Sequence, residues 1–217
     1  MKTGNKVLFS LAGCSVLVMS NVLAQTSRPN ILVVLCDDLG YCDVGFNGSP
    51  DIKTPNIDKL AKGGTVFTSA YVAHPFCGPS RAALMTGRYP QCIGTPYNLR
   101  DEGYETEDGV PLSETFMSNV LHDAGYYTAA IGKWHLGDAD RFSPNNRGFD
   151  EFYGFLGGGH SYFPDKYKPM YNQQSKAGKY PIKGYIKPLM HNNQPAGETE
   201  YITDELSNQT IRVVNGL

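Results

Sequence analysis

The feature that most constrains the fold is a run of five apolar residues, 31–35 (Ile-Leu-Val-Val-Leu), followed almost at once by Asp37 and Asp38. The run is apolar on both of its alternating faces, so it predicts a strand buried on both sides, as in a parallel sheet. Leu39 and Gly40 complete a turn signal where this strand would end. Ligands of open parallel sheets bind beyond the carboxyl ends of the strands, so the two carboxylates mark a candidate site.

The order of the elements that follow indicates an α/β fold. We expect strands over 65–73 and 127–131, helices over 54–60, 79–86, 113–124 and 202–214, and extended surface loops over 155–200. Strands that alternate with helices imply crossover connections, and therefore a mostly parallel sheet flanked by helices. No strand follows the last helix to cover its apolar stripe, so we expect the domain to be incomplete at the C-terminus.

The composition fits a globular protein of ordinary size. The chain has 217 residues, of which 41% are hydrophobic, and 19 basic residues against 21 acidic ones give a net charge of -2. A nucleic-acid-binding protein would need a basic face, and a disordered chain would be poor in hydrophobic residues. Both classes are therefore disfavoured, and the length suits one domain with a real core.

The first 24 residues have the pattern of a secretory signal peptide. Lys2 and Lys6 precede a largely apolar run, 7–23, and Ala24 supplies a small residue for cleavage. Ser, Gly and Asn interrupt the run, which is short for a membrane span, so we expect export to the periplasm or secretion and no integral membrane segment. Lipidation of a bacterial lipoprotein at Cys14 is the alternative.

Four cysteines remain after this cleavage: Cys36, Cys42, Cys77 and Cys92. An oxidising compartment outside the cytoplasm favours disulfides, whereas the absence of a Cys-x-x-Cys pair argues against a zinc ribbon. A functional role for Cys77 would leave an odd number, which weakens the disulfide interpretation.

Three segments carry chemistry. The oxygens of Asp37 and Asp38 suit Ca²⁺ or Mg²⁺, although a solvated turn would use the same residues. Cys77 stands just before a predicted helix, where free backbone N–H groups can hold a tetrahedral anion. The planar guanidinium of Arg81 adds several hydrogen-bond donors for the same anion. A buried structural cysteine is the alternative.

The third segment follows the strand predicted over 127–131. Lys133 and His135 are two residues apart, so in an extended chain their side chains point the same way. A lysine and a histidine that converge suit anion binding combined with proton transfer. Taken alone the pair is also compatible with an ordinary loop.

Together these segments resemble the signatures of the sulfatase family, which uses formylglycine and belongs to the alkaline-phosphatase-like superfamily. The matching segments are 29–40, 54–60, Cys77-Gly78-Pro79-Ser80-Arg81 through Gly87, and Gly125–His135. The resemblance extends from about residue 28 to the end and implies that residues 25–217 are the N-terminal part of a sulfatase catalytic domain. The implied fold is an alkaline-phosphatase-like α/β sandwich with a mostly parallel sheet flanked by helices.

The resemblance also implies a reaction, the hydrolysis of sulfuric esters of sulfated glycans. A separate formylglycine-generating maturation enzyme would oxidise Cys77, and the hydrated aldehyde would attack the sulfate. The resemblance implies that Asp37, Asp38 and residue 77 bind Ca²⁺, with Mg²⁺ as the alternative ion. It implies that Arg81 lies beside the nucleophile, that Lys133 binds the sulfate and that His135 transfers a proton. His160 or Ser161 would line the sulfate or sugar pocket.

The resemblance leaves alternatives open. A full sulfatase is about twice this length or more and carries further metal ligands in its later part, so we expect no useful turnover from these 217 residues alone. The chain could be a truncated, inactive fragment. Phosphatases and phosphonate hydrolases of the same superfamily are the nearest functional alternatives.

Overall fold

The structure is a computed structural model that describes residues 28–99 and 108–216. The chain divides into two units, residues 1–36 and 37–217. The predicted signal peptide, residues 1–24, and the alternative lipidation site Cys14 lie outside the described residues. Within the two described ranges, no helix has the length and apolar character needed to cross a bilayer.

The apolar run 31–35 does not form a strand. Its five side chains are between 41% and 75% exposed, and its backbone has no strand assignment. An apolar run becomes a buried strand only when another strand pairs with it and other elements cover its faces. The prediction of a buried strand is therefore wrong. The strand predicted over 65–73 is wrong for the same reason, because that segment is exposed along its whole length.

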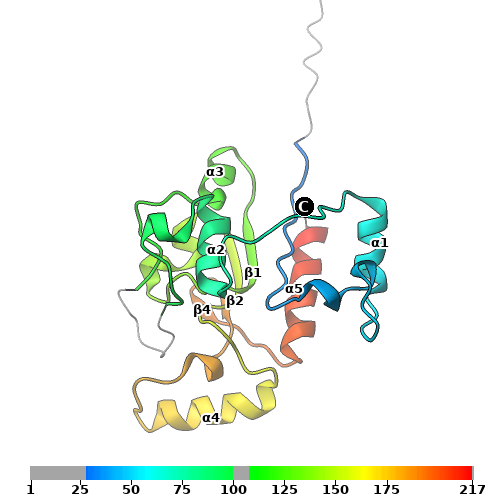
Figure 1. Cartoon of the computed structure of the whole chain (residues 1–217). Helices are drawn as coiled ribbons and strands as arrows, with labels where there is room; N and C mark the ends of the chain where they lie inside the picture. The colour runs from blue at the N-terminus through cyan, green and yellow to red at the C-terminus, as the bar shows by residue number, and fades with distance from the viewer. Residues whose placement is uncertain (1–27, 100–107, 217) are drawn as a thin grey trace, which may run out of the picture. The chain divides into compact units, whose positions relative to one another are not determined.

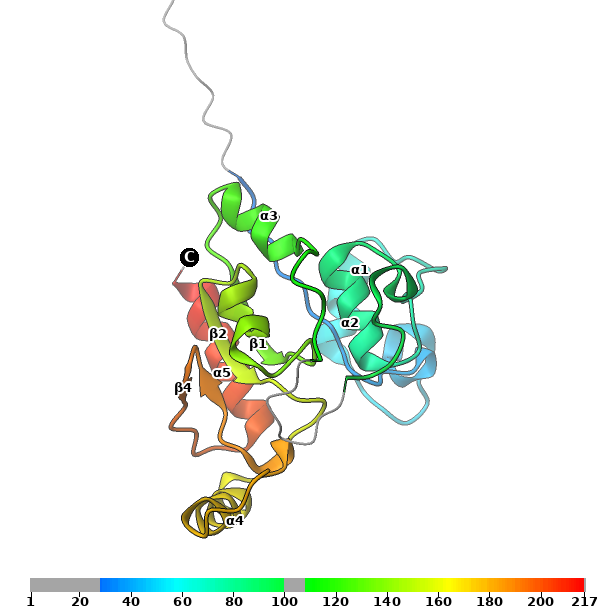
Figure 2. The same cartoon turned by 90° about the vertical axis from the view of Figure 1, so that its left-hand side faces the viewer.

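The sheet in the described residues has four strands in the order β1-β2-β3-β4 (Figures 1 and 2). β1 (Ala129–Lys133) pairs in parallel with β2 (Glu151–Phe155). The hairpin of β3 (Met190–His191) and β4 (Gln194–Pro195) continues the sheet in the antiparallel sense. The α/β class is confirmed, but the sheet is mixed rather than mostly parallel, and β1 starts two residues later than predicted.

Strands β1 and β2 have a hydrophobic cluster on each face. Successive side chains of a strand point to opposite faces, so Phe152 packs into one cluster and Tyr153 into the other. Their partners in β1, Ala130 and Ile131, follow the same division. The first cluster includes residues of α2 and the second includes residues of α4 and α5, so helices cover both faces of this strand pair.

Five α-helices occur in the described ranges: α1 (Pro55–Gly63), α2 (Cys77–Thr86), α3 (Met117–Asp123), α4 (Pro164–Lys176) and α5 (Ile202–Asn215). Four of them confirm the predicted helices. The fifth, α4, corrects the prediction of surface loops over 155–200, as does the hairpin β3–β4. Pro164 at the first position and Asp165 in the first turn are helix-start signals, and they outweigh the Tyr, Asn and Gly content of the region.

Short 3₁₀ turns connect these elements: η1 (Tyr41–Asp43), η2 (Gly45–Asn47), η3 (Pro90–Ile93), η4 (Asp140–Phe142), η5 (Pro144–Arg147) and η6 (Gly184–Ile186). In both views α4 lies well away from α2 and α3, beyond the sheet (Figures 1 and 2).

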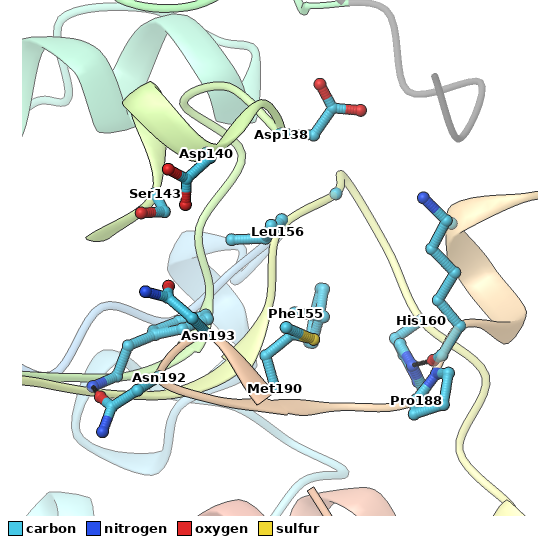
Figure 3. A pocket seen from close by; sticks show the side chains of 14 residues that line it. Asp138, Asp140, Ser143, Phe155, Leu156, His160, Pro188, Met190, Asn192 and Asn193 are labelled. Atoms are coloured by element: carbon cyan, nitrogen blue, oxygen red, sulfur yellow. Dashed lines mark hydrogen bonds between the residues drawn. The ribbon is translucent and has the colours of Figure 1, made fainter. Parts of the chain in front are cut away.

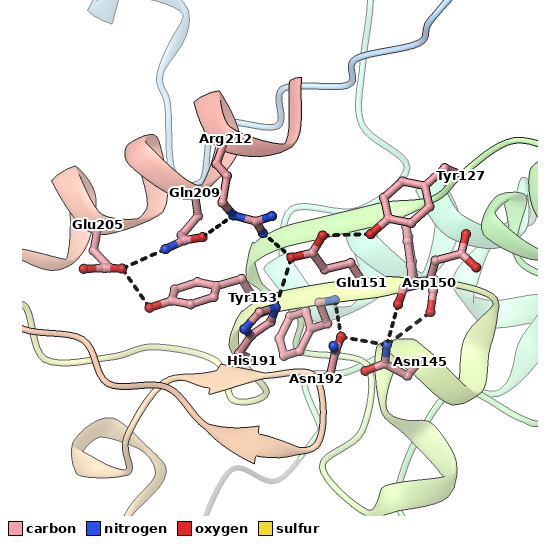
Figure 4. Close-up of polar contacts among 12 residues, drawn as sticks. Tyr127, Asn145, Asp150, Glu151, Tyr153, His191, Asn192, Glu205, Gln209 and Arg212 are labelled. Atoms are coloured by element: carbon pink, nitrogen blue, oxygen red, sulfur yellow. Dashed lines mark hydrogen bonds and ion pairs between the residues drawn. The ribbon is translucent and has the colours of Figure 1, made fainter. Parts of the chain in front are cut away.

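A polar cluster ties α5 to the amino ends of β1 and β2 (Figure 4). Glu151, the first residue of β2, accepts hydrogen bonds from the Tyr127 hydroxyl at 2.8 Å and from Arg212 of α5, and its Oε1 lies 3.0 Å from His191 Nε2. Its side chain is only 9% exposed. Burial raises the pKa of Glu151, but these partners outweigh that effect and hold the pKa below its ordinary value.

Candidate active site

The candidate site lies where α2 begins, beside the carboxyl end of β1. Cys77 is the first residue of α2, two residues before the predicted helix start, and its side chain is half-buried. The Cys77 thiol donates to Asn98 Oδ1 at 3.6 Å, and the Gly78 N–H donates to the same oxygen at 3.0 Å. Sequence reasoning missed Asn98 because no motif surrounds it.

Three predicted site residues converge. Lys133 Nζ donates to Asp37 Oδ2 at 2.8 Å, and Arg81 Nη2 donates to Asp37 Oδ1 at 3.4 Å. Arg81 Nη1 also donates to the Lys133 carbonyl oxygen at 2.6 Å, which fastens α2 to the end of β1. Residues separated by up to 96 positions in the sequence therefore meet in one cluster.

The charges of this cluster favour the ionised form of Asp37. Partial burial raises the pKa of Asp37, but the hydrogen bond from Lys133 and the positive charges of Lys133 and Arg81 outweigh it, so the pKa lies below its ordinary value. The Arg81 Nε–H is buried and has no hydrogen-bond partner among the described residues. A buried donor without a partner is costly, so this atom is available for a ligand acceptor.

His135 lies between the start of α2 and the loop after β2. His135 is 5% exposed, and its backbone N–H donates a hydrogen bond to the Leu156 carbonyl oxygen at 2.9 Å. A Cβ built on Gly158 would lie 2.9 Å from His135 Nε2, and one built on Gly78 would lie 3.6 Å from its Cε1. Any side chain at Gly158 would therefore displace the imidazole.

The backbone of His135 corrects the expectation of an extended chain from Lys133 to His135. The φ angle of His135 is 61°, in the left-handed region, so the two side chains do not lie on one face of a strand. Asp38, exposed, has a φ of 54°. Left-handed backbone at non-glycine residues is uncommon and is often associated with functional sites.

His160 and Ser161 belong to the loop that follows β2. The His160 ring packs against Phe155 and Tyr167, with centroid distances of 5.2 and 4.8 Å. Its two nitrogens lie 2.7 Å from the carbonyl oxygens of Ser161 and Lys187. His160 thus joins this loop to residue 187, and none of these contacts brings it to the cluster around Asp37.

The structure does not gather the predicted metal ligands into one set. Asp37 is bound to Lys133 and Arg81, and within residues 28–99 and 108–216 no group of three or more His, Cys, Asp and Glu side chains could hold a metal ion. Ca²⁺ takes about 6–8 oxygen ligands, and two adjacent carboxylates supply only part of them. The four cysteines predicted to remain after cleavage are all free.

The fold and this site define the class of protein. A family model for sulfatases matches residues 29–215, so the chain belongs to the sulfatase family and its α/β fold is the alkaline-phosphatase-like one. The chain is 45% identical over 131 residues to N-acetylgalactosamine-6-sulfatase of Mus musculus, a match that covers 58% of this chain and 25% of the mouse protein.

Solved structures are similar as well. The crystal structure of Ps i-CgsB matches with a TM-score of 0.84 and 57% identity, over 88% of this chain and 42% of that one. The same protein in complex with k-i-k-neocarrahexaose matches with a TM-score of 0.80 and 58% identity, over 83% and 40% of the two chains. The PsFucS1 sulfatase from Pseudoalteromonas sp. matches with a TM-score of 0.66 and 30% identity, over 88% and 41%. The chain therefore spans less than half the length of these relatives.

Proposed function

We propose that this chain carries the nucleophile and the sulfate-binding side chains of a sulfuric ester hydrolase that acts on sulfated glycans. The observation that carries the proposal is the junction of α2 with β1. Cys77 begins the helix, Arg81 binds the strand end and Asp37, and Lys133 and His135 leave the strand beside it. The contacts among Arg81, Lys133 and Asp37, close to the helix start that carries Cys77, support this assignment.

The nucleophile in this proposal is formylglycine, made from Cys77 by a separate maturation enzyme. When present, its hydrated aldehyde supplies the attacking oxygen. The half-buried position of Cys77 at a helix start supports this role, because the first backbone N–H groups of a helix attract anions.

The cations of the cluster bind the sulfate and orient the nucleophile. The Lys133 ammonium neutralises charge on the sulfate oxygens while Asp37 holds it in place. The unpartnered Nε–H of Arg81 donates to an oxygen at residue 77 or on the ester. His135, fixed by the Leu156 carbonyl and by Gly158, takes up a proton during release of the product.

Asp37 and Asp38 contribute carboxylates to a divalent-cation site, most simply for Ca²⁺. The described residues supply an incomplete ligand set for such an ion. When bound, the ion would withdraw charge from the sulfate oxygens. Binding would require Asp37 to exchange at least one of its contacts with Lys133 and Arg81.

Sulfated glycans are the proposed substrates because the names of the relatives point to that chemistry. The mouse relative is an N-acetylgalactosamine-6-sulfatase, and Ps i-CgsB was solved with k-i-k-neocarrahexaose. His160 and Ser161 are the proposed contacts with the sugar, and His160 supports this by lining a cavity at the end of β2. Lys2, Lys6 and the apolar run 7–23 support export, so the enzyme would meet these glycans in the periplasm or outside the cell.

Mass spectrometry of the peptide that contains Cys77 tests the proposal directly. Conversion of the thiol to the aldehyde lowers the peptide mass by about 18 Da, and the loss must disappear in Cys77→Ala. The matured full-length protein that contains this chain is then assayed with an aryl sulfate and the matching aryl phosphate. Sulfate release that depends on Cys77 supports the proposal; faster phosphate release or an unmodified but active Cys77 contradicts it.

A further inference from the structure

A cavity of about 270 Å³ lies at the end of β2 and beside the loop that follows it (Figure 3). Its walls come from residues 138–143, 152–160 and 184–193, and they include Asp138 and Asp140. Leu156 and Gly157 line the cavity. The Leu156 carbonyl oxygen accepts a hydrogen bond from the backbone N–H of His135. One stretch of backbone therefore separates the cavity from the proposed proton-transfer residue.

The outer wall of this cavity belongs to an unusually basic part of the chain. Residues 166–187, which we call the lysine-rich segment, contain six lysines and no acidic residue, although the whole chain has a net charge of -2. The lysines are Lys166, Lys168, Lys176, Lys179, Lys183 and Lys187. The segment comprises most of α4, the turn η6 and the connection between them.

Most of this charge faces solvent. Lys166, Lys176, Lys179 and Lys183 are exposed, whereas Lys168 bonds to Glu198. Two exposed aromatic rings lie in the same segment, Tyr180 at 72% and Tyr185 at 50% exposure. Lysines interspersed with exposed rings suit a chain of sugars that carries anionic groups, because the ammonium groups bind the anions and the rings pack against apolar sugar faces.

The fold joins the lysine-rich segment to the site. Gly184 and Lys187 line the cavity, the Lys187 carbonyl lies 2.7 Å from His160 Nε2, and the Tyr185 carbonyl accepts the Ser161 N–H at 2.9 Å. The lysine-rich segment thus extends from the cavity wall through η6 to α4, which lies far from α2 in both views (Figures 1 and 2).

We propose that the cavity and the lysine-rich segment bind the part of a polysulfated glycan that does not react. The inference rests on the proposed function and deepens it: the cavity takes a sugar next to the sulfated one, and the exposed lysines bind the sulfates of the following sugars. A protein with this second region prefers long polysulfated chains to small sulfate esters, because each added sulfate contributes another charge contact.

The test measures binding of the 217-residue chain to a sulfated galactan, with Lys176, Lys179 and Lys183 changed together to Gln. We expect a loss of affinity of about tenfold and a weaker dependence on salt, because three exposed charge contacts are removed. The matched control changes Lys53, Lys59 and Lys62 to Gln, which are exposed and alter the net charge equally. Changing Lys176, Lys179 and Lys183 to Arg instead of Gln should retain binding, because the positive charges are kept.

Four results would overturn the inference. They are an unchanged affinity in the first variant, an equal loss in the control variant, equal binding of the chemically desulfated galactan, and equal binding of single-stranded DNA. Modification of Cys77 and hydrolysis of an aryl sulfate are followed separately, on the full-length protein that contains this chain. Failure of those two measurements would reject the proposed function, whereas the binding series reports on the lysine-rich segment alone.

Discussion

The two ends of the strand pair β1–β2 use the same chemistry for different purposes. At the amino end, Glu151 is 9% exposed and is held by Tyr127, Arg212 and His191. At the carboxyl end, Asp37 is 39% exposed and is held by Lys133 and Arg81. Both carboxyl groups have pKa values below their ordinary values: burial raises each pKa, but Lys133 and Arg81 outweigh it at Asp37, and the Tyr127 hydroxyl, Arg212 and His191 outweigh it at Glu151.

The difference lies in what surrounds the charges. Glu151 has partners from β3 and α5 that close over it, so its ion pairs stabilise packing of the helix on the sheet. Asp37 remains accessible, and beside it lie a helix start and an arginine Nε–H without a partner in the described chain. A carboxylate with its cations is structural where the fold covers it, and available for a ligand where the fold leaves it open.

The largest expected effect concerns the carboxyl end of the strand pair, where Asp37 is accessible. Lys133→Gln removes the cation that the proposal assigns to the sulfate, so sulfate release from an aryl sulfate by the matured protein should fall about 10²–10³-fold. The unfolding midpoint should change little, since Arg81 still binds Asp37. Lys62→Gln, an exposed lysine of α1, is the control. Normal turnover by Lys133→Gln would remove the distinction between the two ends.

The next effect concerns the amino end of the strand pair, where Glu151 is covered. Glu151→Ala leaves Arg212 and Tyr127 without their acceptor in a partly buried place, which should lower the free energy of unfolding by about 2–4 kcal/mol. Urea unfolding measures this loss. Glu200→Gln, at an exposed carboxylate that accepts a hydrogen bond from Asn208, should be nearly neutral. Similar losses in both variants would mean that the Glu151 cluster has no special role.

Acid should weaken both ends. A carboxyl group whose pKa is depressed by folding contributes stability above its unfolded pKa, about 3.9 for Asp and about 4.3 for Glu, and that contribution is lost as the pH falls through the lower folded pKa. Urea unfolding between pH 6 and pH 3 should follow this course. Glu151→Ala should show a smaller loss over the same range, and an equal loss would contradict the assignment.

The smallest effect should come from a single hydroxyl. Tyr127→Phe removes one donor to Glu151 but leaves Arg212 and His191, so we expect a loss of about 1 kcal/mol. Thermal unfolding is sensitive enough to detect it. Tyr97→Phe, at a residue that is 75% exposed, serves as the control. A loss as large as that of Glu151→Ala would show that the phenol contributes more than one hydrogen bond.

The sequence predicted the helices well because their ends carry local signals. Pro55 begins α1, and Gly87 ends α2 in the left-handed conformation that favours glycine. The apolar run 31–35 failed as a strand because pairing depends on distant partners. β2 was missed because Gly148 and the acidic residues before and at its start are not typical of a strand. The segment becomes a strand through its parallel pairing with β1, which is distant in the sequence.

The site was predicted in part. Asp37, Arg81 and Lys133, which the signatures singled out in three separate segments, lie in one cluster. The left-handed backbone of His135 and the amide of Asn98 beneath Cys77 have no local sequence signal. His160 was assigned from the family resemblance of its segment; its ring packs against Phe155 and Tyr167 and also lines the cavity.

The hydrogen bond from Arg81 to the carbonyl of Lys133 has a mechanical consequence. The helix that presents residue 77 and the strand that presents the lysine cannot drift apart without breaking this 2.6 Å contact. Thermal motion therefore shifts both together, and their separation fluctuates less than that of two independent loops. In the proposed reaction, groups held in such register would need little reorganisation, which would lower the entropic part of the barrier.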